Sequence, residues 1–306
     1  MATLGLHTVF IPGLLCSARL YDPLLPAAWA HGAVTVADSR RDDTVHGMAA
    51  RLLDDAPERF VLVGLSMGGY VAHEVMRQAP DRVIGLALIS TSARPDSAEQ
   101  RENRQGQRQA VLEGRFDELV EAVFSVLPDP ANAADEQLRA WWRLMAHEVG
   151  AEAFVSQLDA VMARPDSRPG LVAITCPTAV IHGTGDRLIT PDNAAETADA
   201  IPGAVLTLVD RAGHMLPQEQ PAAAHAALTA LLDRGDGNQL IPPLHSAMAA
   251  TDPRPDTASR ACGSPEACDP GESDQSRPVE DVPRDRAPCG MSGLSRWTWP
   301  PRRERL

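Results

Sequence analysis

Lysine is absent from this chain of 306 residues, so every basic side chain is an arginine. The absence excludes mechanisms that need a lysine Schiff base or a lysine general base. Basic residues are also outnumbered, because 28 arginines stand against 41 acidic residues and leave a net charge of −13. A chain of that charge has no basic face to displace counterions from phosphates, and we expect no nucleic-acid partner.

Cysteine is scarce, and long apolar runs are missing. The five cysteines are an odd number, and no pair in the first 234 residues has the spacing of zinc ligands, so we expect neither a disulfide framework nor a metal site. No stretch is long enough to span a bilayer, and the amino terminus lacks the basic and apolar regions of a signal peptide. We therefore expect a cytoplasmic protein without a membrane partner.

Aromatic residues make up only 4% of the chain, and the composition changes after Arg234. The segment 235–306 holds eleven of the 26 prolines, no Phe or Tyr, and no hydrophobic stripe of useful length. Such a segment cannot bury a core, which predicts a disordered tail. A short partner-docking peptide around Trp297 and Trp299 is the alternative interpretation.

Residues 1–94 and 171–234 alternate between apolar strand patterns and helical patterns. The predicted helices are 18–30, 45–55, 67–78 and 218–232, and the predicted strands are 8–11, 34–37, 60–65, 83–90, 178–182 and 205–209. This alternation is typical of a doubly wound α/β protein, with a mostly parallel sheet of about six strands covered on both faces.

Residues 95–170 show helical periodicity only. Their apolar stripes include Leu119, Val123 and Phe124, then Leu138, Trp141, Trp142 and Met145, then Phe154 and Leu158. A helical insertion at this point would lie over the carboxyl ends of the strands, where ligands bind in such sheets. We expect it to be a lid, the alternative being a helical subdomain without a role in substrate binding.

The strongest motif is Gly64-Leu65-Ser66-Met67-Gly68, which joins a buried strand to an amphipathic helix without a spacer. A serine at such a turn has a strained backbone, and glycines on both sides let the chain pass close to itself. The amides that open the next helix place partial positive charge beside the hydroxyl. Ser66 is therefore the predicted nucleophile, against the alternative of a buried serine without chemistry.

A serine nucleophile needs a base and an acid that orients the base. His214 follows the strand 205–209, and Asp186 follows the strand 178–182, so both loops should meet Ser66 at one end of the sheet. Asp96, after the fourth strand, is the alternative acid. Other histidines compete less well because they lie within helices, at strand ends, beside early elements or in the tail: His7, His31, His73, His147, His182, His225 and His245.

An oxyanion that develops during attack on a carbonyl needs two amide donors aimed at one point. The backbone N–H of Met67, directly after the nucleophile, is one candidate. The other is the N–H of Leu14, in the turn that follows the first strand, where Gly13 allows a tight bend. A plain strand-ending turn is the alternative interpretation of that loop.

These segments together resemble the α/β hydrolase superfamily, in particular the small-lid esterases and enol-lactonases of bacteria. The matching segments are 11–15, 64–69, 182–191 and 213–217, and the resemblance covers about residues 6–234 in element order. Pro12-Gly13 stands where many members carry His-Gly. The chain also begins at what would be the third strand of that family.

The resemblance implies a serine hydrolase that cleaves carboxylic esters through an acyl-enzyme and requires no cofactor. The expected partner is a small-molecule ester or lactone. Four residues of the insertion are expected to bind the apolar part of the substrate: Phe124, Trp141, Trp142 and Met145. An enol-lactone substrate would also need a cation for its carboxylate, for which Arg19 and Arg143 are candidates. A non-catalytic binding protein on the same fold is the remaining alternative.

Overall fold

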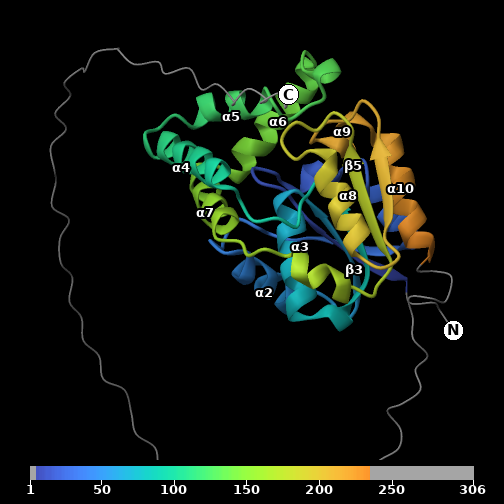
Figure 1. Cartoon of the computed structure of the whole chain (residues 1–306). Helices are drawn as coiled ribbons and strands as arrows, with labels where there is room; N and C mark the ends of the chain where they lie inside the picture. Colours follow the sequence, from blue (N-terminus) through green and yellow to red (C-terminus); the bar gives the residue numbers. More distant parts are fainter. Residues whose placement is uncertain (1–4, 235–306) are drawn as a thin grey trace, which may run out of the picture. The chain divides into compact units, whose positions relative to one another are not determined.

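A parallel sheet of six strands forms the centre of the molecule in the computed structural model, which describes residues 5–234. The strands lie in the order β2-β1-β3-β4-β5-β6, and every neighbouring pair is parallel (Figure 1). Their bounds are β1 Leu6–Ile11, β2 Gly32–Val36, β3 Phe60–Leu65, β4 Val83–Ile89, β5 Thr178–Gly183 and β6 Val205–Val209. The predicted fold class and strand number are thus confirmed.

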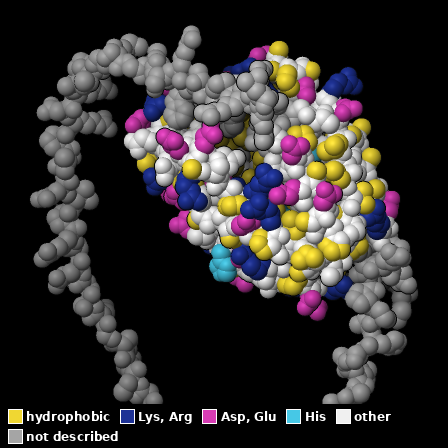
Figure 2. Space-filling model, in the orientation of Figure 1, with side chains coloured by type: hydrophobic (Ala, Val, Ile, Leu, Met, Phe, Trp, Pro, Cys, Tyr) yellow, Lys and Arg dark blue, Asp and Glu magenta, His cyan; other side chains and the backbone are white. Residues whose placement is uncertain are grey.

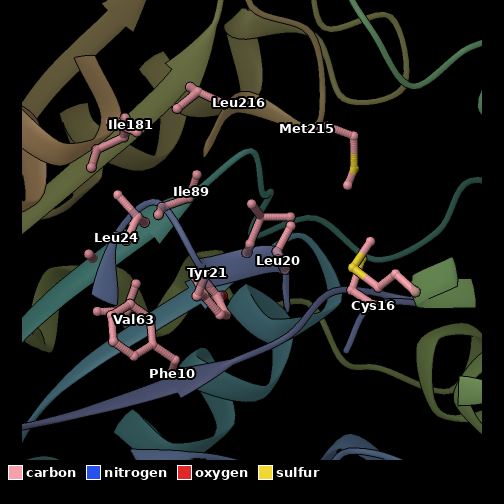
Figure 3. Packing of buried hydrophobic residues seen from close by; sticks show 14 of the residues in the cluster. Phe10, Cys16, Leu20, Tyr21, Leu24, Val63, Ile89, Ile181, Met215 and Leu216 are labelled. Atoms are coloured by element: carbon pink, nitrogen blue, oxygen red, sulfur yellow. The ribbon is translucent and has the colours of Figure 1, made fainter. Parts of the chain in front are cut away.

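Successive residues of the central strands point into two different cores, one on each face of the sheet. On β1, Phe10 belongs to one buried cluster and Val9 to the other; on β3, Val63 and Leu62 divide in the same way. Every residue of β3 and β4 is buried, which explains why these strands read as unbroken apolar runs. Figure 3 shows the first cluster, where the rings of Phe10 and Tyr21 pack with their centroids 4.5 Å apart.

Helices cover both faces of the sheet. The helices α1 (Leu25–His31) and α10 (Pro221–Arg234) pack together on one face, where Leu228 and Leu231 join the cluster of Phe10. On the other face lie α2 (Val45–Asp55) and α3 (Met67–Gln78), together with α8 (Pro191–Ala200), which the sequence did not predict. Both α2 and α3 begin and end where the sequence predicted them.

Two predicted helices are divided in the structure, in each case beside a proline. Residues 18–30 form a 3-10 turn, η1 (Ala18–Tyr21), and then α1, because Pro23 lacks the N–H that a continuous helix needs. Residues 218–232 were predicted as one helix, but a short α9 (Leu216–Glu219) ends before Pro221 opens α10. Strands β1 and β2 begin two residues earlier than predicted, because Leu6 pairs with Gly32 in the ladder.

Four helices occupy the segment between β4 and β5. They are α4 (Ala98–Leu112), α5 (Phe116–Phe124), α6 (Glu136–Val149) and α7 (Ala151–Met162), and we call them the helical insertion, residues 98–162. A capping box at Ser97 opens α4, and the Asp135 carboxylate caps α6. Gly150, at φ 83°, turns the chain between α6 and α7, so the two helices follow one another directly.

The helical insertion lies at the carboxyl ends of the strands (Figure 1). Three hydrogen bonds place it there, because they join it to the loops after β1, β6 and β5. The amide of Leu15 bonds to Gln157, the amide of His214 to the carbonyl of Leu127, and the Arg187 guanidinium to the carbonyl of Ser125. Its helical content agrees with the sequence, while its role as a lid stays a prediction.

Arginine and acidic side chains are interspersed over the face that Figure 2 draws, without a large field of one sign. Across residues 5–234, no helix has both the length and the apolar character needed to cross a bilayer. The predicted tail, 235–306, with Trp297 and Trp299, lies outside the described residues.

Candidate active site

Ser66 occupies the turn between β3 and α3 with φ 53° and ψ −114°, a conformation that costs energy for a residue with a side chain. A Cβ at position 64 would overlap the carbonyl of Gly68, and one at position 68 would overlap the carbonyl of Ile11. The turn is held further by the Thr91 hydroxyl, which donates to the Ser66 carbonyl at 2.8 Å. These contacts explain why the predicted glycines are needed at this turn.

The side chains of Ser66, His214 and Asp186 form a hydrogen-bonded chain at the carboxyl end of the sheet. His214 Nδ1 lies 2.8 Å from Asp186 Oδ2, and His214 Nε2 lies 2.9 Å from Ser66 Oγ. A carboxylate accepts hydrogen bonds, so the neutral imidazole carries its proton on Nδ1 and accepts the Ser66 hydroxyl at Nε2. Ser66 keeps 8% of its surface exposed, against 3% and 2% for His214 and Asp186.

Asp186 is held in its ionised form by its donors. Its Oδ1 accepts the amides of Leu188 and Ile189 at 2.9 and 3.0 Å. Burial favours the neutral acid, but the electrostatic interaction with His214 and hydrogen bonds from His182 and His214 outweigh it and hold the pKa of Asp186 well below its usual value. A carboxylate that stays ionised can stabilise an imidazolium beside it.

Asp96, the alternative acid, lies elsewhere. Its carboxylate pairs with Arg164 at 2.7 Å and with Arg104 at 2.8 Å, and it has no contact with His214. Arg164 also lies over the ring of Tyr70 on α3, at 4.1 Å from its centroid. This buried group of charges joins the helical insertion to the sheet domain.

The other histidines of the described residues have partners of their own or are buried away from Ser66. His182 Nε2 donates to the carbonyl of Ile189 at 2.8 Å and lies 3.3 Å from Asp186 Oδ2, so it helps to hold the Asp186 loop in place. His73 is enclosed in α3, where burial lowers its pKa to about 4. His7 contacts Thr35. Neither His73 nor His7 is placed to take a proton from Ser66.

The two predicted oxyanion donors lie on segments that touch. Met67 is the first residue of α3, and amides in the first turn of a helix have no acceptor within it. Leu14 is half-buried in the turn after β1, and the preceding Gly13 lies so close to the carbonyl of Leu65 that a Cβ there would stand 3.3 Å from it. Their role as oxyanion donors stays a prediction.

Three of the four predicted substrate-binding residues lie inside the core of the helical insertion. Phe124, Trp142 and Met145 are at most 2% exposed, and the Trp142 indole donates to the carbonyl of Val120 at 2.9 Å. Trp141 is partly buried against the same core. Packing within the insertion accounts for this burial, and a contact with substrate stays a prediction.

The two candidate cations for a substrate carboxylate are paired with glutamates. Arg143 is joined to Glu121 on the neighbouring helix, and Arg19 lies 2.6 Å from Glu148. Both pairs are partly exposed on the surface of the molecule. In residues 5–234, no three His, Cys, Asp or Glu side chains are gathered so that they could hold a metal ion.

Comparison with known proteins supplies the family. A profile of the "Alpha/beta hydrolase family" matches residues 8–228. The chain belongs to the alpha/beta hydrolase family. The pimeloyl-(acyl-carrier protein) methyl ester esterase of Klebsiella pneumoniae subsp. pneumoniae is 27% identical to this hydrolase family member over 242 residues, which are 74% of this chain and 94% of the esterase.

Solved structures of hydrolases also resemble this member of the family. A thermophilic esterase from Thermogutta terrifontis matches with a TM-score of 0.69 and 27% identity, over 75% of this chain and 90% of that esterase. The enol-lactonase from Burkholderia xenovorans LB400 matches with a TM-score of 0.68 over 75% of this chain and 92% of the lactonase. At 24% identity, that second likeness supports the alpha/beta hydrolase fold.

Sequence reasoning missed two residues that support the site of this alpha/beta hydrolase. Glu219 accepts the amides of Gly213 and Met215, on either side of His214. Gln157, on α7, accepts the amide of Leu15 beside the predicted oxyanion donor. Glu219 lies five residues after His214 and between two glutamines, so only a weak signal in the sequence marks its role. Gln157 gave no signal in the sequence.

Proposed function

We propose that this protein hydrolyses carboxylic esters through an acyl-enzyme on Ser66. The observation that carries the proposal is the hydrogen-bonded chain from the Ser66 hydroxyl through His214 to Asp186. A protein that kept the fold only to bind a ligand would not need to preserve all three. The esterases of Klebsiella pneumoniae and Thermogutta terrifontis, each 27% identical, support an ester as the substrate.

In the proposed mechanism, each of the three hydrogen-bonded residues has one role. Ser66 Oγ attacks the ester carbonyl carbon while its proton passes to His214 Nε2. Asp186 stabilises the imidazolium, which then gives that proton to the alcohol oxygen as the carbon–oxygen bond breaks. Water next loses a proton to His214 and attacks the acyl carbon, so that the acid leaves and the Ser66 hydroxyl is restored.

Negative charge builds on the carbonyl oxygen in both steps, and the amides of Leu14 and Met67 are the proposed donors to it. Each donor of this kind contributes about 3 kcal/mol to stabilisation of the transition state. The close packing of Gly13 on the carbonyl of Leu65 supports this proposal, because it brings the Leu14 turn against the start of α3.

We propose that the helical insertion is the lid of this site. Its contacts with the loops that carry Leu15, Asp186 and His214 support that role. Its interior is apolar, which favours esters with a modest hydrophobic acyl or alcohol group.

The direct test is labelling with a fluorophosphonate, which reacts with an activated serine, followed by peptide mapping. We expect one label, on Ser66, and hydrolysis of short-chain p-nitrophenyl esters. A protein that takes no label and cleaves no ester would be a binder on a hydrolase fold.

A panel of esters and enol-lactones that carry a carboxylate then distinguishes the two substrate classes. We expect esters to be cleaved faster, because Arg19 and Arg143 are already paired with glutamates. Preferred cleavage of the lactones would replace the ester proposal by the lactonase alternative.

A further inference from the structure

Gln157 is a fully buried amide that joins the helical insertion to two loops of the sheet domain. Its Oε1 accepts the backbone N–H of Leu15 at 3.0 Å, 142 residues away in the chain. Its Nε2 donates to the carbonyl of Ser39 at 3.2 Å and lies 3.4 Å from the Ser39 hydroxyl. Both ends of the amide are therefore satisfied, and the side chain is 0% exposed.

Leu15 has a backbone conformation that a leucine rarely adopts. Its φ is 57°, in the left-handed region where the Cβ crowds the following carbonyl. An interaction from outside the turn is needed to keep this strained conformation populated. The hydrogen bond from the Leu15 amide to Gln157 is such an interaction.

The peptide groups around Leu14 are fixed from both sides. The carbonyl of Gly13 accepts the amide of Cys16 at 3.1 Å, and the carbonyl of Leu14 accepts the Cys16 thiol at 3.3 Å. In a trans peptide the N–H points opposite to the C=O, so the bond at the Gly13 carbonyl sets the direction of the Leu14 N–H. Gln157 adds a third hydrogen bond to this turn by accepting the N–H of Leu15.

We infer that Gln157 is a positioning residue for the oxyanion donor of Leu14. The inference rests on the proposed function and deepens it, because it makes the helical insertion part of the machinery that stabilises charge. Without the Gln157 acceptor, Leu15 relaxes from its left-handed conformation. The Leu14 N–H then no longer points toward the oxyanion. Gln157 itself touches no substrate atom.

The test compares Gln157→Met, which has similar length but no acceptor for the Leu15 amide, with the unaltered chain. The matched control is Gln109→Met, because Gln109 is exposed on α4 and its side-chain amide donates to Glu113, directly after that helix. For a p-nitrophenyl ester, we expect Gln157→Met to lower kcat by about 10- to 100-fold. KM should stay within about twofold, because the ground-state carbonyl depends little on the donor.

Inhibition by a trifluoromethyl ketone distinguishes a positioning role of Gln157 from a purely structural one, because a structural role would leave the inhibition constant unchanged. The ketone carbon bonds to Ser66 Oγ and its oxygen becomes an oxyanion, so its inhibition constant reports on the donors. We expect that constant to rise in Gln157→Met by the same factor by which kcat/KM falls. Gln157→Glu retains an acceptor oxygen for the Leu15 amide and is expected to regain part of both losses.

The inference is overturned if folded Gln157→Met keeps both kcat and the inhibition constant within twofold of the unaltered chain. A fall in kcat with an unchanged inhibition constant overturns it as well. If Gln157→Met does not fold, the same two criteria apply to Gln157→Leu, which also lacks an acceptor for the Leu15 amide. Failure of the proposed function is a separate result, since the unaltered chain would then take no fluorophosphonate label.

Discussion

Glu219 holds His214 through the backbone on both sides of it. One carboxylate oxygen, Oε1, accepts the amide before His214 at 2.9 Å and the amide after it at 3.1 Å. The other, Oε2, accepts the amide of Asp129 at 2.7 Å and the side-chain amide of Asn132 at 2.9 Å. The loop of the proposed base and a turn of the helical insertion are thus tied to one carboxylate.

Glu219→Gln should lower kcat by about tenfold and leave KM nearly unchanged. The new NH₂ group would face backbone amides that are themselves donors, so the His214 loop loses part of its support. Steady-state kinetics with an ester measures the effect, and Glu118→Gln on the exposed surface of α5 controls for the change of charge. An unaltered kcat would mean that His214 does not need this carboxylate.

Ser66→Ala should reduce kcat by a factor on the order of a thousand or more, because no nucleophile remains to form the acyl-enzyme. The variant should also take no fluorophosphonate label. Ser156→Ala, on α7, is the matched control and should keep full activity. A Ser66→Ala protein that hydrolyses esters at the full rate would rule out the proposed mechanism.

Asp186→Asn should mainly affect catalysis, whereas Asp96→Asn should mainly affect stability. The first should lower kcat on the order of a thousandfold, because an amide neither fixes the imidazole tautomer nor stabilises its charge. The second should mainly lower the free energy of unfolding, by about 3 kcal/mol, because it leaves Arg104 and Arg164 without their buried partner. Kinetics and urea unfolding separate the two, and a reversed pattern would make Asp96 the functional acid.

His73 should make the folded state sensitive to mild acid. Burial lowers its pKa to about 4 from an ordinary value of 6.5, so the folded state holds His73 neutral while the unfolded chain gains a proton. The stability is fully present above pH 6.5 and is lost as pH falls toward 4, by about 3 kcal/mol at most. His73→Leu should flatten the free energy of unfolding over this window, whereas His147→Gln, at an exposed position, should not.

The elements that the sequence predicted well are those whose signal is local. Strand β3 is apolar at every position because both faces of the sheet cover it, and α3 follows it through a glycine-flanked turn. The structure brings Ser66, Asp186 and His214 together because all three follow parallel strands at the same edge. Their positions could therefore be predicted from element order alone, while their catalytic roles stay predictions.

The supporting contacts could not be predicted, because they depend on distant segments. Gln157 meets Leu15 only after the helical insertion has packed over the sheet, and no periodicity marks a single glutamine on a helix. The positive φ of Leu15 could not be predicted either, because glycine is the residue that usually indicates such a conformation and this position is a leucine. Pro23 and Pro221 mark the two helix breaks locally, but the apolar pattern on both sides of each proline is also that of a continuous helix.

The carbonyl of Leu127 and the amide of Gln157 give the helical insertion two fixed attachments beside the reacting groups. The helical insertion could be exchanged with that of another hydrolase to obtain a new specificity, but such an exchange must also preserve these two attachments. A chimera needs an acceptor for each of the two backbone amides as well as a new surface for the ligand. Grafts chosen by cavity shape alone should yield proteins that fold and bind yet turn over slowly.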